Sequence, residues 1–388
     1  MYDTLLSVWR SSAGRRGARE KVTRAGGLSP DELHRVAASV RELSRGLTRD
    51  RALAGERYLS DPALLGAYLL HFWPVSYCQA LLCAAMMRRA SGAMTASGGS
   101  GLGTVLDVGA GPGAVSLALL DSGAARVTAL DRSGAALSLA RRIAEARDQE
   151  LATHTWDATG TTAPPGGPFD LIALGHTLNE LWAGHPDRIG LRAQLVQRLA
   201  GQLAPNGRVL ILEPALMSTA QEAILVRDRL AAAGFVVELP CIWQEACPAL
   251  PDGTCHGEFE WSPPPAMVRL AHAARIGRET LKMAWFVLRK APVPPVGDPA
   301  ASPDGGLYRV VSDPLLSKSG RVRYLVCGPL GRFALSAARG ERGPGLAPFF
   351  RLARGDGIRF TGAVRRETGW GLDPRSAVEV VQRAPRLE

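Results

Sequence analysis

The spacing of apolar and polar residues predicts helices over residues 1–95. Ser29-Pro30-Asp31-Glu32 places an N-cap, a first-turn proline and two acids ahead of the apolar positions from Leu33 to Leu47. Ser60-Asp61-Pro62 gives the same start signal for a second helix near Ala63. The apolar segment Leu64–Met87 is broken by polar residues and is interpreted as a pair of buried helices. The Gly- and Ser-rich stretch from Ala93 to Gly103 is expected to be a linker.

Beyond this stretch, short apolar runs alternate with amphipathic segments. Repeated strand–helix units predict a parallel sheet with helices on both faces, and hence an α/β fold. The expected strands are Thr104–Val108, Arg126–Leu130, Leu171–Leu174, Val209–Leu212 and Lys282–Leu288, and the expected helices are Ala114–Leu120, Ala135–Ala146, Arg188–Leu203 and Met217–Ala233.

A proline-rich segment from Ala291 to Gly306 is expected to be a second linker. Short apolar runs among glycine turns follow it, at Tyr324–Cys327, Phe333–Ser336 and Ile358–Thr361. They predict a small β-rich domain, for which an OB-like barrel is one candidate. The expected domains are therefore 1–95, 104–290 and 307–388.

The composition is that of a globular protein, with 46% apolar and 21% charged residues among 388. No run of eighteen apolar residues occurs, so no membrane span is expected. Arginines precede any long apolar run at the N-terminus, which argues against a signal peptide. The Ala-, Arg- and Gly-heavy composition suits a GC-rich bacterial genome. We expect a cytoplasmic location in a bacterium, or a mitochondrial one if the source is eukaryotic.

The formal charge of +10 is concentrated at both ends of the chain. Residues 1–60 hold 12 basic and 7 acidic residues, and residues 301–388 hold 15 and 8. The middle of the chain is slightly acidic. Basic ends that flank a near-neutral domain suggest an anionic polymer, with RNA rather than DNA as the expected partner. An arginine-rich composition with ordinary solvated surfaces explains the charge alone equally well.

A glycine-rich loop with the sequence DVGAGPG follows the first strand at positions 107–113. Glycines at this place allow a sharp turn and a close approach of the backbone to a ligand. A carboxylate at the end of the next strand, eighteen residues after the loop, can accept hydrogen bonds from ribose hydroxyls. Pro112 stands where a phosphate-binding loop needs a free N–H, which favours S-adenosylmethionine over NAD. The expected cofactor-binding residues are Asp107, Gly109, Gly111, Gly113 and Asp131.

The loop and the following ALDRS segment resemble the class I S-adenosylmethionine-dependent methyltransferases. The resemblance implies that Asp157, in HTWDATG, approaches the adenine. Members that methylate exocyclic amines often carry an Asn/Asp-Pro-Pro-aromatic motif after the fourth strand, and this chain has GHTLNEL there. His176 and Glu180 are weak candidates for catalytic bases. Asn179 and Glu180 also suit the start of a helix, and for Glu180 we favour that structural interpretation.

Four of the six cysteines have an unusual spacing. Cys241, Cys247 and Cys255 are separated by five and then seven residues, and Cys327 follows after seventy-one more. Four thiolates suit a tetrahedral zinc or a cubane iron–sulfur cluster, and His256 is a lesser candidate ligand. The remaining two, Cys78 and Cys83, lie in the apolar helical segment and are expected to be core residues.

Together the helical start, the glycine loop, the HTLNEL segment and the cysteine spacing resemble one family. It is the methyltransferase-like protein of the small ribosomal subunit, a family of mitochondrial ribosome assembly factors with bacterial relatives. The resemblance spans roughly Leu53–Arg332. It implies a 4Fe–4S cluster on the four cysteines, and the small ribosomal subunit and its rRNA as partners. The sequence between the first two cysteines, CIWQEAC, departs from the family, which usually has a histidine there and a Cys-Pro pair at the first cysteine.

Three functions fit these observations. The first is a cofactor- and cluster-binding protein that acts on the small ribosomal subunit in assembly or translation. The second is an active rRNA methyltransferase. The third is a small-molecule methyltransferase with a structural zinc, which leaves the charge at both ends unexplained. The sequence does not reveal the methylated atom, the choice between cluster and zinc, or the oligomeric state.

Overall fold

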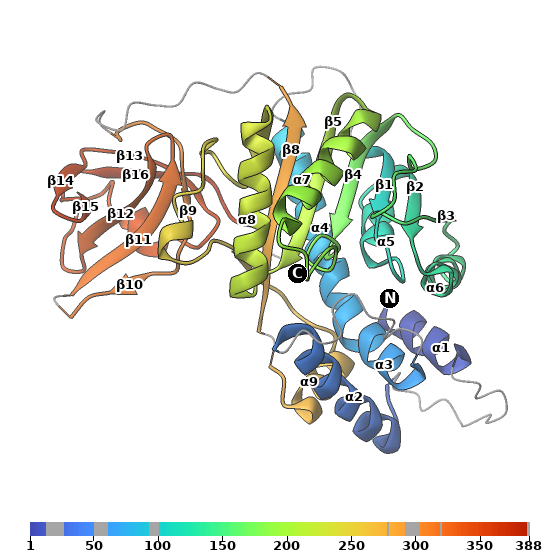
Figure 1. Cartoon of the computed structure of the whole chain (residues 1–388). Coiled ribbons are helices and arrows are strands. Elements are labelled where there is room, and N and C mark those ends of the chain that lie inside the picture. Colours follow the sequence, from blue (N-terminus) through green and yellow to red (C-terminus); the bar gives the residue numbers. More distant parts are fainter. Residues whose placement is uncertain are drawn as a thin grey trace. The chain divides into compact units, whose positions relative to one another are not determined.

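The computed structural model describes residues 1–12, 27–49, 61–92, 101–277, 279–291, 303–318 and 320–385. Most of the two expected linkers therefore lies outside the described residues. The chain forms two compact units (Figure 1). The first comprises Met1–Leu212 and Glu260–Leu281, and the second comprises Glu213–Phe259 and Lys282–Arg386.

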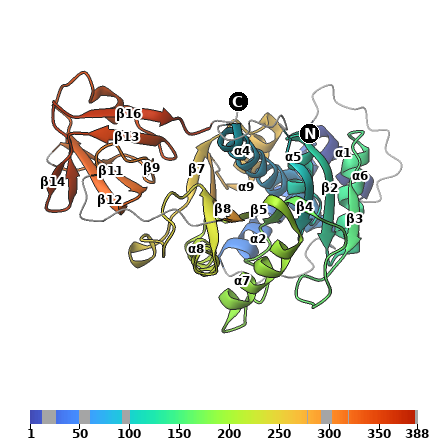
Figure 2. The same cartoon turned by 90° about the horizontal axis from the view of Figure 1, so that it is seen from above.

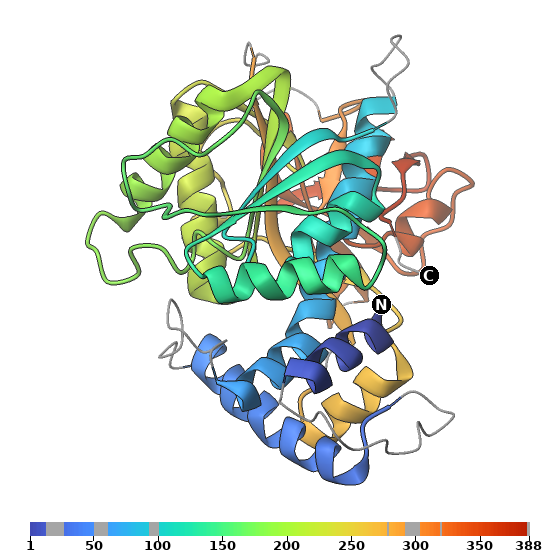
Figure 3. The ribbon, with the colours of Figure 1, turned by 90° about the vertical axis from the view of Figure 1, so that its right-hand side faces the viewer.

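The helical part of the first unit begins where the sequence places its start signals. Ser29 and Glu32 form a capping box, because Ser29 Oγ accepts from the Glu32 N–H and the Glu32 carboxylate accepts from the Ser29 N–H. Asp61 caps the next helix by accepting from Ala63 N. Figure 3 shows the N-terminal helices beside α9. The helices of this helical region are α1 Tyr2–Ser12, α2 Pro30–Thr48, α3 Pro62–Ala67, the π-helical η2 Tyr68–Phe72, α4 Trp73–Gly92 and α9 Pro265–Ala274.

The apolar segment after Asp61 is a single helical run, so the expectation of a helix pair is wrong. The helix continues through a π-helical turn at Tyr68–Phe72, which contains His71, and the other polar interruptions lie within α4. In the described part of the chain, this run (Pro62–Ala90) is the one helix long and apolar enough to cross a membrane. Because 67% of its most apolar window is buried, a core helix explains the same properties.

The sheet of the first unit has the strand order β3-β2-β1-β4-β5, and its pairings are parallel. The central strands β1 and β4 are almost entirely buried, as expected of strands covered on both faces. The strands are β1 Gly103–Val108, β2 Ala124–Asp131, β3 Ala152–Thr155, β4 Phe169–Gly175 and β5 Leu203–Pro214. The helices between them are α5 Ala114–Asp121, α6 Gly134–Glu145, α7 Arg188–Leu199 and the 3-10 turn η3 Ala200–Gln202.

The second unit combines one helix with two groups of strands. In the first group β6 pairs antiparallel with β8, and β7 also pairs with β8. These elements are α8 Met217–Ala232, β6 Phe235–Leu239, η4 Leu250–Asp252, β7 Gly257–Glu260 and β8 Thr280–Lys290.

The second group forms the C-terminal sheet, with the order β14-β15-β12-β11-β9-β13-β16 and β10 beside β11 (Figure 2). It encloses its own apolar core around Tyr308, Tyr324, Phe349 and Phe360. The strands are β9 Tyr308–Val310, β10 Leu315–Leu316, β11 Arg321–Gly328, β12 Gly331–Ala338, β13 Gly357–Thr361, β14 Val364–Arg366, β15 Gly369–Gly371 and β16 Ala377–Gln382, with the 3-10 turn η5 Ala347–Arg351.

The expected fold class is confirmed: a Rossmann-like sheet, a helical N-terminal region and a β-rich C-terminal part. The finer interpretation of the C-terminal sheet as an OB-like barrel stays a prediction.

Candidate cofactor site and cysteine cluster

The three loop glycines adopt positive φ angles of 73°, 52° and 78°, at Gly109, Gly111 and Gly113. A Cβ at Gly109 would overlap Thr177 Oγ1, and one at Gly113 would stand 2.9 Å from Ala140 Cβ. At Gly111 no described atom lies within 4 Å of that position. Two glycines therefore permit close packing, whereas Gly111 faces open space in which a ligand fits.

Asp131 ends β2 beside this loop. Its Oδ2 accepts a hydrogen bond from Gly111 N at 2.8 Å, and its Oδ1 accepts one from Ser133 N at 2.8 Å. These bonds fix the orientation of the carboxylate. Because each carboxylate oxygen has more than one acceptor site, both can still accept a hydroxyl. The expected role of Asp131 in binding a ribose stays a prediction.

Asp107 is fully buried in β1, where its Oδ2 accepts from Ser116 Oγ at 2.5 Å. Its Oδ1 has no hydrogen-bond partner in the described part of the chain. Burial is the main cause that raises the pKa of Asp107 to about 7, against the lowering effect of Ser116. An unsatisfied acceptor of this kind suits a polar group of a bound cofactor.

Asp157 follows β3 in an exposed turn. Its Oδ1 accepts from the N–H and the hydroxyl of Thr159, at 2.9 and 2.7 Å, and these bonds lower its pKa. The carboxylate therefore stabilises its own turn. Its expected approach to an adenine stays a prediction.

The GHTLNEL segment packs directly against the glycine loop. Thr177 Oγ1 donates to the Val108 carbonyl at 2.9 Å, at the end of β1. His176 has a positive φ of 58°, and its Nε2 lies 2.9 Å from Gln79 Oε1 of α4. The fold thus brings His176 to the same end of the sheet as Asp107 and Asp131.

The expectation that Glu180 starts a helix is wrong. Residues 178–184 form turns, and α7 begins only at Arg188, capped by Asp187. Arg192, which is 1% exposed, donates to the carbonyls of Asn179 and Leu181 at 3.2 and 3.0 Å. Those carbonyls are held outside a helix, because the guanidinium satisfies them instead.

Two aromatic residues of the helical region also reach the site, and the sequence did not indicate them. Trp73 Nε1 donates to the Pro112 carbonyl at 2.9 Å. Tyr68 lies in the π-helical turn, and its pKa is raised by burial and then by the charges of Glu180, Asp131 and Asp107. Tyr68 therefore lies near three carboxylates of the site. The polar interruption of the apolar run near His71 was the sequence feature that could have drawn attention to Tyr68 and Trp73.

The strand–loop–helix with a glycine turn and a carboxylate after the second strand is the arrangement expected of class I methyltransferases. Residues 105–207 match the family model described as a methyltransferase domain, and this match covers β1 to β5. Such a domain implies S-adenosylmethionine as the cofactor.

Solved structures similar to this chain have low sequence identity and low TM-scores. Mitomycin 7-O-methyltransferase MmcR is 18% identical, with 68% of this chain and 69% of that chain covered and a TM-score of 0.36. A ribosomal protein L11 methylase from Lactobacillus delbrueckii subsp. bulgaricus is 19% identical, with 53% and 76% covered and a TM-score of 0.32. A putative RNA methyltransferase from Pyrococcus horikoshii is 15% identical, with 48% and 73% covered and a TM-score of 0.30. No curated protein matches the chain.

The four spaced cysteines lie together in the second unit. Burial raises the pKa of all four thiols, to about 12 for Cys327. In each of the six pairs of these cysteines, the charge of one thiol raises the pKa of the other. Within the described ranges, no three Cys, His, Asp or Glu side chains are arranged so that they could hold a metal ion. The four thiols therefore influence one another, but their arrangement in this structure is not that of a metal site, and a tetrathiolate centre stays a prediction. The members of the group are Cys241, Cys247, Cys255 and Cys327.

A buried arginine of α8 supports the loop that carries three of these cysteines. Arg227 is 1% exposed, donates to the carbonyls of Trp243 and Glu245, and pairs with Asp228 at 2.7 Å. Asp228 in turn accepts from Cys247 N at 2.9 Å. A charged pair inside the apolar run ILVRDRL was the sequence signal for this support.

The remaining cysteines and His256 have other surroundings. Cys83 is fully buried and Cys78 is half-buried in α4, as expected of core residues, and burial raises both pKa values. Burial and Arg354 lower the pKa of His256, whose carbonyl accepts from Arg354 at 3.4 Å. His256 stays a lesser candidate ligand.

One face of the C-terminal sheet carries arginines around small residues. Ser336 of β12 pairs with Arg323 on one side and with Gly371 on the other. Arg366 covers Gly371 where a Cβ would stand, and Arg321 lies 3.4 Å from the Ser336 carbonyl. Arg321 and Arg366 therefore lie over the small residues Ser336 and Gly371 on this face.

Proposed function

We propose that this chain is an S-adenosylmethionine- and iron–sulfur-binding protein that acts on the small ribosomal subunit by binding its rRNA. The proposal rests on one observation: the four cysteine thiols and the basic C-terminal sheet belong to the same unit.

The cofactor part rests on the glycine loop. When bound, S-adenosylmethionine supplies an electrophilic methyl group. Asp131 would bind its ribose, the open space at Gly111 would admit it, and Asp107 would accept a hydrogen bond from it. His176 and Tyr68 lie at this end of the sheet, so a substrate group could be oriented there.

In the cluster part, Cys241, Cys247, Cys255 and Cys327 would be the ligands. Four thiolates and a 4Fe–4S core of charge +2 leave a net charge of −2 on the site. Arg227, Arg332 and Arg354 lower the pKa values of these thiols, so their charges also favour an anionic centre. Such a centre would tie the loop after β6 to β11, joining segments that are distant in sequence.

The RNA part rests on the arginine face of the C-terminal sheet. Planar guanidinium groups bind phosphates through two hydrogen bonds. Arg321, Arg323 and Arg366 would bind the phosphates of a nucleic-acid backbone on this face. The role we propose is therefore structural: the cluster fixes a surface that binds rRNA.

Active rRNA methylation remains the alternative function, because the glycine loop and Asp131 are intact. A small-molecule methyltransferase with zinc is the second alternative, since four thiolates also suit that metal. The GHTLNEL segment replaces the amine-methylation motif, which favours binding over catalysis.

The metal test uses protein purified without oxygen. A brown protein with absorbance at about 400 nm and about four irons per chain supports a 4Fe–4S cluster. Stoichiometric zinc without iron would refute it. Cys327→Ser should lower the metal content, the melting temperature and the rRNA affinity, whereas Cys78→Ser, which removes a thiol elsewhere, should leave the metal content unchanged.

The partner test is co-sedimentation with 30S particles. Binding that weakens at high salt supports an rRNA partner, and no binding at low salt would refute it. Tritium transfer from labelled S-adenosylmethionine to purified small-subunit RNA separates the two rRNA functions. Incorporation at one nucleotide would show that the chain is an active methyltransferase.

A further inference from the structure

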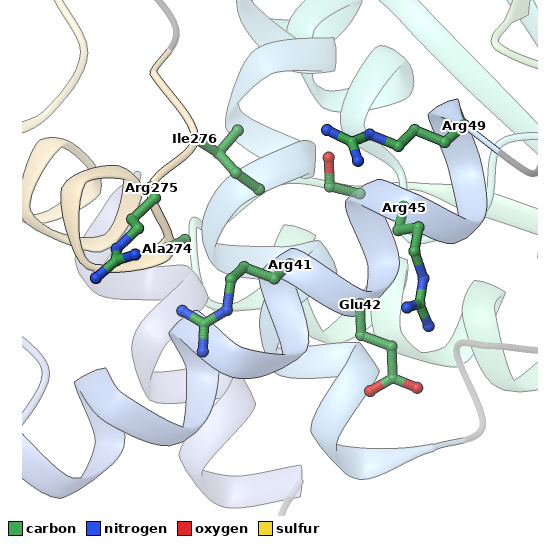
Figure 4. Close-up of a pocket in the computed structure, with 8 residues that line it drawn as sticks. Arg41, Glu42, Arg45, Arg49, Ala274, Arg275 and Ile276 are labelled. Atoms are coloured by element: carbon green, nitrogen blue, oxygen red, sulfur yellow. The ribbon is translucent and has the colours of Figure 1, made fainter.

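A cavity of about 500 Å³ opens in the helical region of the first unit, between the ends of α2 and α9. Four arginines line it (Figure 4). Arg41 and Arg45 of α2 and Arg49 at its C-cap are spaced four residues apart, so they follow one face of that helix. Arg275 comes from the end of α9. The other lining residues are Glu42, Ser44, Ala274 and Ile276.

The fold holds both sides of this cavity in place. Arg41 Nη1 donates to the Ala273 carbonyl at 3.2 Å, which connects α2 to the last turn of α9. Arg275 has a left-handed backbone conformation, with φ 54° and ψ 38°, and ends α9. Beneath them Leu43 and Leu270 are fully buried. The arginines therefore stand on an anchored junction rather than on a free helix end.

Arginine is the main charged residue type in the described lining of this cavity. Among the described lining residues, Glu42 is the only acid beside four arginines. Like charges four residues apart destabilise a helix by about 0.2–0.5 kcal/mol per pair. The helix dipole favours cations only within the last turn, so it offsets this cost for Arg45 and Arg49 but not for Arg41. The guanidinium groups of the four lining arginines would attract an anion to the cavity.

We infer that this cavity binds phosphate groups of an RNA backbone. The inference rests on the proposed action on rRNA and adds a second contact, remote in sequence from the arginine face of the C-terminal sheet. The lining, as far as the structure describes it, includes no aromatic ring on which a base could stack. Guanidinium groups without such a ring recognise phosphates and not sequence, so this contact positions the RNA.

The test compares three double variants of the full chain for binding to purified bacterial 16S rRNA over a range of KCl concentrations. Arg41→Gln/Arg275→Gln and Arg45→Gln/Arg49→Gln each remove two lining charges. Each should weaken binding about tenfold at low salt. Each should also lower the slope of log affinity against log salt by about 1.4–1.8.

The matched control is Arg35→Gln/Arg141→Gln. It removes two exposed arginines of the same unit that do not line the cavity, and it should leave the affinity and the slope close to those of the parent chain. Melting temperatures identify any variant that has lost its fold. If one lining variant is unfolded, the binding of the other lining variant decides whether the cavity contacts RNA. Equal effects in the lining and control variants would overturn the cavity site and leave the proposed function standing. If the parent chain does not bind 16S rRNA, both the proposed function and this site are refuted.

Discussion

Replacing Gly109 and Gly111 by alanine, one at a time, separates two reasons for glycine in the loop. Both residues have positive φ, which costs an L-residue about 1–2 kcal/mol. At Gly109 the new Cβ also meets Thr177, and overpacking costs about 1–3 kcal/mol more. Displacing Thr177 would lose its hydrogen bond to the Val108 carbonyl, worth about 1 kcal/mol.

We therefore expect Gly109→Ala to lower the free energy of unfolding by about 3–6 kcal/mol, and Gly111→Ala by about 1–2 kcal/mol. Urea unfolding followed by far-UV circular dichroism measures both. Adding Thr177→Ala to Gly109→Ala should recover part of the loss, because the overlapping atoms are removed. Gly111→Ala should remain folded but bind S-adenosylmethionine weakly in calorimetry. Equal losses of stability in the two single variants would refute this explanation of the loop.

Three further outcomes are expected. Asp131→Ala should weaken S-adenosylmethionine binding about tenfold to a hundredfold in calorimetry, since it removes charge-assisted acceptors; unchanged affinity would contradict the ribose role. Burial raises the pKa of Asp107 to about 7, so the folded state holds a proton that the unfolded state releases above about pH 4. The stability that Asp107 contributes is present below about pH 4 and is lost as the pH rises through about 7. Asp107→Asn should abolish this part of the pH dependence of urea unfolding. Arg227→Met should lower the iron content of anaerobically purified protein, because the cysteine loop loses its buried donor, while the exposed Arg229→Met on the same helix should not; equal iron content in the two would argue against the support.

Periodicity located β1, β2, β4, β5 and β8 and the helices α5 to α8, because buried strands are short, apolar and bounded by turn residues. It gave no bounds for β3, β6, β7 or α9. It placed the start of α2 through Ser29 and Glu32, whose contacts are local. It failed at Glu180, because a distant guanidinium, Arg192, satisfies the carbonyls that a helix would otherwise use. It also split one buried helix in two, because polar residues in an apolar run do not show whether a neighbour accommodates them.

What the sequence by itself determined is the cofactor loop and the list of cysteines. The loop is a contiguous motif whose conformation follows from glycine's freedom at positive φ. Tertiary structure decided which groups meet: Thr177 against Gly109, Trp73 on the Pro112 carbonyl, and Cys327 beside a loop more than seventy residues earlier. These contacts join segments remote in the chain, and only the packing of whole strands and helices brings them within hydrogen-bond or Coulomb range.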